Sequence, residues 1–228
     1  MKRKRESKKL IKIYQKLYSS IGPRHWWPGD SPFEVIIGAI LTQNTSWKNV
    51  EKAILLLKKN KILNPVGLRK INTKELSEYI RSTGYYNQKS IKLKNFLEFL
   101  DIDFCGSLNE MAREATFVLR KKLLEVKGIG SETADSILLY ALNKPIFVVD
   151  TYTRRIFKRL GIINGDEEYN EIRRYFESAL KDFTKEPENS NSGNHKKEVR
   201  VYNQYHALIV NLGKNFCHKK SPAIMKRA

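Results

Sequence analysis

The chain has 228 residues, of which 41% are hydrophobic and 11% aromatic, so it can bury a core of one large or two small domains, which excludes wholesale disorder. Lysine and arginine number 43 against 24 acidic residues, and the net charge of +19 indicates a polyanionic partner, with nucleic acid ahead of an acidic membrane surface. No run of roughly 18 apolar residues occurs, so we expect no membrane span. The basic start at residues 1–5 lacks the apolar stretch of a signal peptide, and we expect a cytoplasmic or nucleoid-associated protein.

The cysteine content limits the kinds of cross-link and metal site that the chain can form. Only Cys105 and Cys217 occur, and they lie far apart in the sequence. A disulfide framework and a four-cysteine metal or iron–sulfur site are therefore excluded.

The hydrophobic pattern predicts an all-α fold, because the alternation typical of strands is almost absent. Ser31, Pro32 and Glu34 form a helix start, with serine as N-cap, proline at the first helical position and glutamate three residues after the cap. The extended apolar piece 146–149 is too short to imply a sheet, and the polar stretch 184–197 predicts a surface loop. Further amphipathic segments run near 47–59, 73–82, 88–100, 114–124, 131–142, 151–160, 167–180 and 198–212.

Between two amphipathic segments, Gly128-Ile129-Gly130 predicts a tight turn. Two glycines leave backbone N–H groups unobstructed at the start of the next helix, where they can bind an anion, while Ile129 points inward. The pattern is typical of a helix–hairpin–helix that grips a DNA phosphate without reading sequence. The alternative is a sharp connection between two packed helices, but the flanking helices and the positive charge favour phosphate binding, with Lys127 as a further phosphate ligand.

Asp150 follows the apolar run 146–149 and precedes a basic amphipathic segment. Aspartate in this place predicts an N-cap, which stabilises a helix by roughly 1 kcal/mol. Capping does not exclude chemistry, because the helix dipole keeps the carboxylate ionised. A fixed anion can stabilise the oxocarbenium-like sugar that forms when a glycosidic bond breaks, or help water to attack it.

The stretch from Val126-Lys127-Gly128-Ile129-Gly130 to Val148-Val149-Asp150-Thr151 resembles the signature of the endonuclease III superfamily of DNA glycosylases. The resemblance extends over about residues 26–217. It implies a two-domain helical fold with the active site in the cleft between the domains. A helical-barrel domain, 29–142, would end in the helix–hairpin–helix, and a second domain, 1–28 plus 143–228, would carry the catalytic Asp150.

Two departures from the family pattern bear on chemistry. Family members that also cleave the strand carry an imine-forming lysine just after the hairpin, where this chain has Glu132. A carboxylate cannot form an imine, so the resemblance implies water as nucleophile. Many members end in a four-cysteine iron–sulfur loop, of which Cys217 is the only cysteine present, so we expect no cofactor. The family also implies a monovalent cation at the carbonyls of Leu124, Val126 and Ile129.

Two residues match the family's duplex-inserting positions. Gln43, in Leu41-Thr42-Gln43-Asn44-Thr45, would fill the gap left by an extruded base, with capping of its own helix as the alternative. Tyr85, in Thr83-Gly84-Tyr85-Tyr86, would act as an aromatic wedge.

Trp26, Trp27 and Trp47, which we call the aromatic group, complete the candidate site, with core packing as the alternative. Such residues could stack a flipped base, and an electron-poor alkylated base gains cation–π attraction. Three motifs taken together resemble a subgroup that excises 3-methyladenine and lacks the cluster: Trp26-Trp27-Pro28, Leu41-Thr42-Gln43-Asn44-Thr45 and Tyr85-Tyr86-Asn87-Gln88-Lys89. Its predicted base-pocket residues are Trp26, Trp27, Pro28, Trp47, Glu132 and Lys220.

These observations predict a monofunctional DNA glycosylase that flips a damaged base and hydrolyses its N-glycosidic bond. We expect it to act as a monomer on double-stranded DNA that contains damaged bases. Two alternatives remain open: a non-catalytic DNA-binding module, which Asp150 disfavours, and a bifunctional lyase, which Glu132 disfavours.

Overall fold

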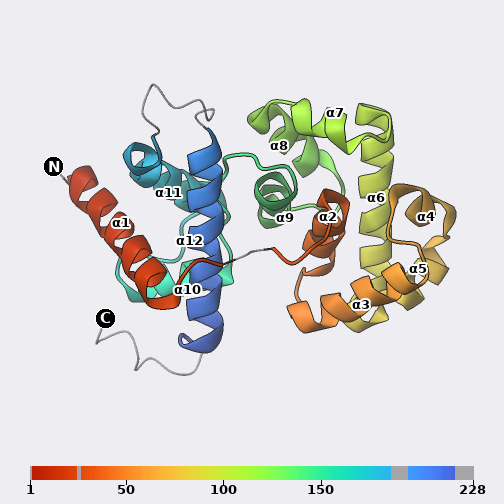
Figure 1. Ribbon diagram of the computed structural model, residues 1–228, viewed down its shortest axis with the longest axis horizontal. Helices are drawn as coiled ribbons and strands as arrows, with labels where there is room; N and C mark the ends of the chain where they lie inside the picture. The colour runs from red at the N-terminus through yellow and green to blue at the C-terminus, as the bar shows by residue number, and fades with distance from the viewer. Residues whose placement is uncertain (1, 25–26, 186–194, 219–228) are drawn as a thin grey trace. The chain divides into compact units, whose positions relative to one another are not determined.

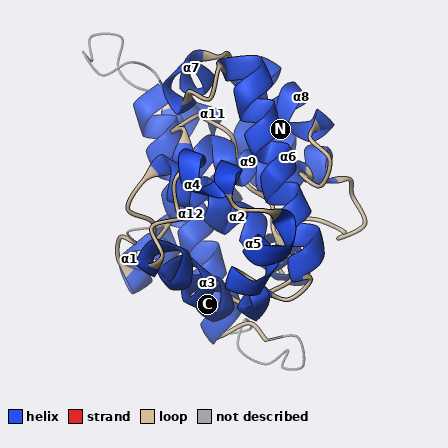
Figure 2. Cartoon of the chain, turned by 90° about the vertical axis from the view of Figure 1, so that its right-hand side faces the viewer, coloured by secondary structure: helices blue, strands red, loops and turns tan. Residues whose placement is uncertain are grey.

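A computed structural model describes residues 2–24, 27–185 and 195–218 of the chain. Every regular element in these ranges is a helix, as predicted, and no strand occurs among them (Figure 2). None of the helices described is long and apolar enough to cross a membrane. The chain divides into two compact units, Trp27–Leu142 and Met1–Trp26 with Asn143–Ala228.

The unit formed by Trp27–Leu142 is built around helix α2 (Pro32–Leu41), whose residues from Phe33 to Leu41 are all buried. Ser31 caps α2 by accepting a hydrogen bond from the Glu34 N–H at 3.2 Å, so the predicted helix start is confirmed. Helices α3, α6 and α9 pack against α2 (Figure 1), and the turn η2 also contacts it. The remaining elements are α3 (Trp47–Lys59), α4 (Pro65–Lys70), α5 (Thr73–Tyr79), the 3₁₀ turn η1 (Arg81–Thr83), α6 (Tyr86–Phe104), α7 (Leu108–Arg113), α8 (Thr116–Glu125), α9 (Ser131–Ser136) and the π-helical turn η2 (Ile137–Ala141).

The other unit contains α1 (Lys2–Ile21), α10 (Thr151–Arg159), α11 (Tyr169–Thr184) and α12 (His195–Asn215). Its core is aromatic: the Phe147 and Phe176 rings stack with centroids 4.5 Å apart, and Phe157 meets Phe176 edge-on. Tyr205 of α12 joins the same cluster, and its hydroxyl donates to the Leu10 carbonyl of α1 at 2.9 Å. These contacts join all four helices around one core.

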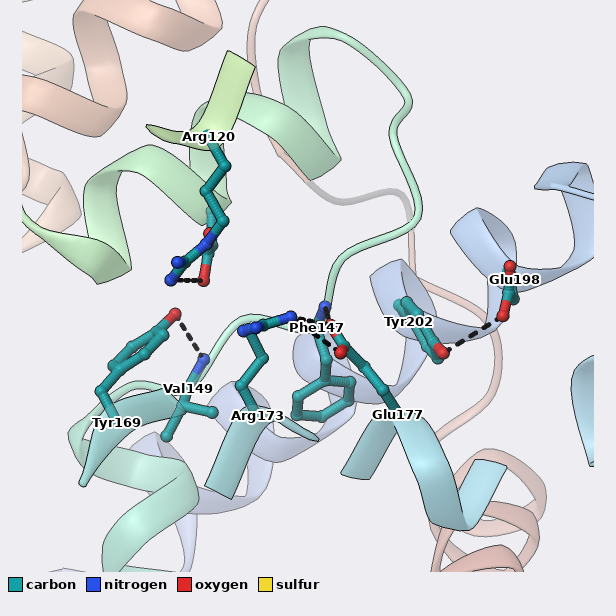
Figure 3. A network of polar contacts seen from close by, with 9 residues as sticks. Arg120, Phe147, Val149, Tyr169, Arg173, Glu177, Glu198 and Tyr202 are labelled. Carbon is teal, nitrogen blue, oxygen red and sulfur yellow. Dashed lines mark hydrogen bonds and ion pairs between the residues drawn. The ribbon is translucent and has the colours of Figure 1, made fainter. Parts of the chain in front are cut away.

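The apolar piece 146–149 is buried and forms neither helix nor strand. Side chains of α11 bind its backbone instead. The Phe147 N–H donates to the Glu177 carboxylate at 3.0 Å, and the Val149 N–H donates to the Tyr169 hydroxyl at 3.2 Å (Figure 3). Arg173 in turn pairs with Glu177 at 2.8 Å. These bonds fix the course of the chain into Asp150.

Three features differ from the predicted elements. Helices α4 and α7 were not predicted. The predicted helix 73–82 is divided between α5 and η1, and 131–142 between α9 and η2. Of the predicted loop 184–197, the structure describes only the ends: α11 finishes at Thr184, α12 begins at His195, and residues 186–194 lie outside the described part.

Candidate active site

The hairpin between α8 and α9 has the form that its sequence predicts. Gly128 has φ +98°, a value that L side chains rarely adopt, so the turn requires glycine there. Ile129 is buried, and its N–H donates to the Val126 carbonyl at 3.0 Å across the turn. Lys127 and Gly130 are exposed, and nothing lies within 4 Å of a Cβ placed on Gly130. The turn therefore anchors itself through Ile129 and exposes its backbone around Gly130.

A buried ion pair that the sequence analysis missed connects the two helices of the hairpin. Arg120 of α8 donates from Nε and Nη2 to the two carboxylate oxygens of Asp135 on α9, at 2.6 and 3.1 Å. Figure 3 shows the Arg120 side chain with this contact. Because the Asp135 side chain is fully buried, we expect the loss of either partner of this ion pair to destabilise the hairpin.

Gln43 contacts the hairpin directly. Its Nε2 donates to the Gly128 carbonyl at 3.1 Å and to the Thr133 hydroxyl at 3.0 Å, and its Oε1 accepts from Lys92 of α6. The end of α2 is capped by another residue, since the Thr42 hydroxyl donates to the Gly38 carbonyl at 2.6 Å. The amide of Gln43 thus binds the hairpin rather than α2.

Tyr85 is the N-cap residue of α6 and is 69% exposed. Its φ of 48° and ψ of 31° place it in the left-handed region, which is uncommon for a residue with a bulky side chain. Gly84 before it also has a positive φ, +66°. An exposed aromatic ring on a backbone of this kind is costly for packing alone and suits a role in binding.

Trp27, which precedes α2, and Trp47, the first residue of α3, lie together against α2. Their ring centroids are 5.6 Å apart, and the Trp27 ring also lies 5.1 Å from Tyr140 of η2. Gly38 of α2 permits this approach, because a Cβ there would be 3.2 Å from Trp27 Nε1 and 3.4 Å from Trp47. Both tryptophans are half-buried and Pro28 is exposed. Tyr140 was not among the residues predicted for the base pocket, and the predicted Trp26 and Lys220 lie outside the described residues.

Glu132, Leu124 and Val126 are the remaining residues predicted near the hairpin. Glu132 is exposed in the first turn of α9, where the helix dipole favours a negative charge. The Val126 carbonyl accepts the bond from Ile129 across the turn, and the predicted cation site that also includes Leu124 stays a prediction. Across the described parts of the chain, no group of three or more His, Cys, Asp or Glu side chains is placed to hold a metal ion.

Asp150 is the N-cap of α10 and forms a capping box with Thr153, so the capping prediction is confirmed. Its Oδ1 accepts from the Thr153 N–H at 2.7 Å and from the Thr153 hydroxyl at 2.9 Å. His206 of α12 places Nε2 3.6 Å from the other carboxylate oxygen. Burial alone would raise the pKa of Asp150, but His206 and the Thr153 bonds outweigh it and hold that pKa below its usual range. The result is a buried carboxylate that stays ionised.

His206 was not singled out in the sequence, although a signal was present. It is the only titratable side chain in the otherwise apolar run 205–210 apart from Tyr205, and it is 4% exposed. A buried histidine in such a run has a polar partner that the sequence does not name.

The cysteines do not fit an iron–sulfur cluster, which needs four thiolates. Cys217 is buried and accepts a hydrogen bond on its sulfur from Arg159 at 2.8 Å. Arg155 binds the Cys217 carbonyl at 2.8 Å and the Gly213 carbonyl at 2.9 Å, so two arginines of α10 secure the end of α12. Cys105 is exposed at the end of α6.

Comparison with known proteins identifies the family to which the chain belongs. The family described as HhH-GPD superfamily base excision DNA repair protein matches residues 37–182. A Methanocaldococcus jannaschii protein assigned as a DNA repair glycosylase is 45% identical over 214 residues, which is 93% of this chain and 90% of that protein. The H. pylori 3-methyladenine DNA glycosylase, solved with 1,N6-ethenoadenine, is 32% identical with a TM-score of 0.77, over 90% of this chain and 97% of that one. An endonuclease III–DNA complex shares the fold at 20% identity, with a TM-score of 0.72 over 95% and 90% of the two chains. The chain therefore belongs to the HhH-GPD superfamily of base excision DNA repair proteins.

Proposed function

We propose that this DNA glycosylase is monofunctional: it flips an alkylated base out of double-stranded DNA and hydrolyses its N-glycosidic bond with water. The observation that carries the proposal is the carboxylate of Asp150, which is buried, ionised and fixed by Thr153. A preorganised anion stabilises the positive charge that develops on the sugar as the bond breaks, and no reorganisation is needed at that moment.

Glu132 supports hydrolysis rather than lyase chemistry. It stands in the first turn of α9, at the position where strand-cleaving relatives carry their nucleophilic lysine. A carboxylate has no amine with which to attack the sugar carbon. Lys127 is the nearest lysine in sequence, but it lies exposed in the hairpin turn, where we assign it, with Gly128, Ile129 and Gly130, to phosphate binding.

The aromatic group supports an alkylated base as substrate. In our proposal Trp27 and Trp47 stack the flipped base, with Tyr140 behind Trp27, because a methylated purine is electron-poor and gains from contact with a ring face. The 32% identity to a 3-methyladenine DNA glycosylase points to the same class of lesion. Gln43 and Tyr85 would enter the duplex as gap filler and wedge, and no iron–sulfur cluster would be involved.

The proposal is tested by incubating the protein with duplexes that each carry one modified base, and with methylated genomic DNA. The released base is identified by mass spectrometry. Asp150→Asn serves as the matched inactive variant. We expect release of methylated adenines as free bases, with the abasic strand left intact. Release of oxidised pyrimidines alone would contradict the assignment of substrate, and release of no base from any duplex would contradict the catalytic assignment.

A further inference from the structure

Lys89 is a buried lysine that the proposed mechanism does not use. It lies in the first turn of α6 and is 1% exposed. Its Nζ donates to the Leu41 carbonyl at 2.9 Å and to the Thr83 carbonyl at 2.7 Å. Both acceptors belong to the same compact unit as Lys89, so the contact is internal to that unit.

The two carbonyls that Lys89 binds belong to the last residues of α2 and η1. Leu41 is the last residue of α2 and stands two residues before Gln43. Thr83 is the last residue of η1 and stands two residues before Tyr85. A single ammonium group therefore connects the ends of the two segments to which we assign duplex insertion.

Keeping an ammonium group at this place is costly. Burial, together with the positive charge of Lys92 one turn further along α6, lowers the pKa of Lys89 to about 8. Two carbonyl oxygens replace only part of the lost hydration, and no carboxylate of the described residues forms an ion pair with Nζ. Fold stability alone would be served by an apolar side chain and local caps.

The neighbouring lysine gives α6 a second link to the same segment. Lys92 donates to Oε1 of Gln43, whose Nε2 binds the hairpin. Helix α6 thus contacts the gap-filling segment at its backbone through Lys89 and at its side chain through Lys92.

We propose that Lys89 is a positioning residue that fixes the separation between the ends of α2 and η1, so that Gln43 and Tyr85 enter the duplex as one unit. The inference rests on the proposed function, because it assumes insertion by these two residues. A misplacement of about 1 Å at such a site can cost on the order of a hundredfold in rate.

Lys94 provides a matched control. It lies on α6 like Lys89, and its Nζ likewise donates to backbone carbonyls, those of Leu68, Arg69 and Ile71. These acceptors are at the end of α4, away in sequence from both inserting segments. If the hydrogen bonds of Lys89 to carbonyls served stability alone, substitution of Lys89 and of Lys94 should affect excision in the same way.

The experiment compares Lys89→Met with Lys94→Met, at a temperature where circular dichroism shows both folded. Single-turnover excision of the same methylated base is measured in duplex and in single-stranded DNA, because only the duplex has a gap to fill. We expect Lys89→Met to lower the duplex rate about 10- to 100-fold and the single-strand rate by less than about threefold. Lys94→Met should leave the ratio of the two rates unchanged. Lys89→Gln, which retains an N–H donor, should recover part of the duplex rate and replaces Lys89→Met if that variant does not fold.

A second readout does not depend on excision. Preference for a duplex that contains an abasic-site analogue over an undamaged duplex should fall in Lys89→Met and in Gln43→Ala, and the double variant should lose no more than the worse single variant. Equal losses in duplex and single strand, or an unchanged preference for the abasic duplex, would overturn the inference even if the wild-type protein excises bases. Absence of excision by the wild-type protein, together with a preference that falls in Lys89→Met, would overturn the proposed function alone.

Discussion

Changing Asp150 to asparagine separates the chemistry of this carboxylate from its structural part. Oδ1 accepts both contacts from Thr153, at 2.7 and 2.9 Å, and an asparagine oxygen can accept the same two bonds. Asparagine and aspartate are also about equally good N-caps. We therefore expect the free energy of unfolding to change by less than about 1 kcal/mol.

The effect on catalysis should be far larger. Removal of one well-placed electrostatic group typically lowers the rate about a hundredfold to a thousandfold, which is about 2.7–4.1 kcal/mol of transition-state stabilisation. Affinity for the duplex should stay level or rise, since a negative charge is removed from a protein that binds phosphates.

Single-turnover release of methylated bases measures the rate, and urea unfolding measures stability. Thr153→Ala is the matched control, because it removes one hydrogen bond to Asp150 and leaves the charge. This variant should lose some stability but keep more of the excision rate than Asp150→Asn. Excision by Asp150→Asn at the wild-type rate would refute the electrostatic role of Asp150. If Asp150→Asn and Thr153→Ala lost stability and activity in parallel, the role of Asp150 would be structural.

Three other outcomes are expected. Gly128→Val should weaken binding to all duplexes alike, as measured by gel shift on unrelated sequences. The valine side chain would collide with Lys92, and its backbone would have to adopt a φ of +98°, which L side chains rarely do. A loss of affinity confined to some sequences would indicate that the hairpin reads bases. Trp27→Ala should lower excision of alkylated bases at least about tenfold more than affinity for an abasic duplex, by analogy with aromatic base stacking; equal losses would indicate core packing. The difference in free energy of unfolding between wild type and Lys89→Met should change in favour of wild type as the pH rises from 8 to 10.5. The pKa of Lys89 is about 8 in the folded protein and 10.5 ordinarily, so the unfolded chain binds more protons in that range. A difference that stays constant with pH in urea titrations would contradict the burial of the Lys89 charge.

Local sequence signals predicted the elements that depend on neighbouring residues. The cap at Ser31, the cap at Asp150 and the inward Ile129 follow from spacing of a few residues. Helices α4 and α7 were missed because each has six residues and buries a single side chain, Leu68 or Met111, so neither shows a hydrophobic period. The π-helical turn η2 depends on a shift in backbone bonding that apolar residues do not encode.

The contacts that the sequence did not predict share a different cause. Arg120 with Asp135, Gln43 with Thr133 and Lys89 with Leu41 join positions 15, 90 and 48 residues apart. Tertiary packing determines these partners. The sequence of a helix shows that a polar residue is present, but it does not show which carbonyl or carboxylate that residue will contact. Sequence can flag such a residue as an unexplained polar side chain on an apolar face, as with His206, but it leaves the partner open.

The central claim, that water rather than a protein amine attacks the sugar, is tested most directly by borohydride trapping on a duplex from which the protein is seen to release the base. Glu132 stands where an imine-forming lysine would be required, so we predict release of the base with no covalent protein–DNA adduct and an unbroken abasic strand. A covalent adduct formed in step with base release would contradict the hydrolytic mechanism.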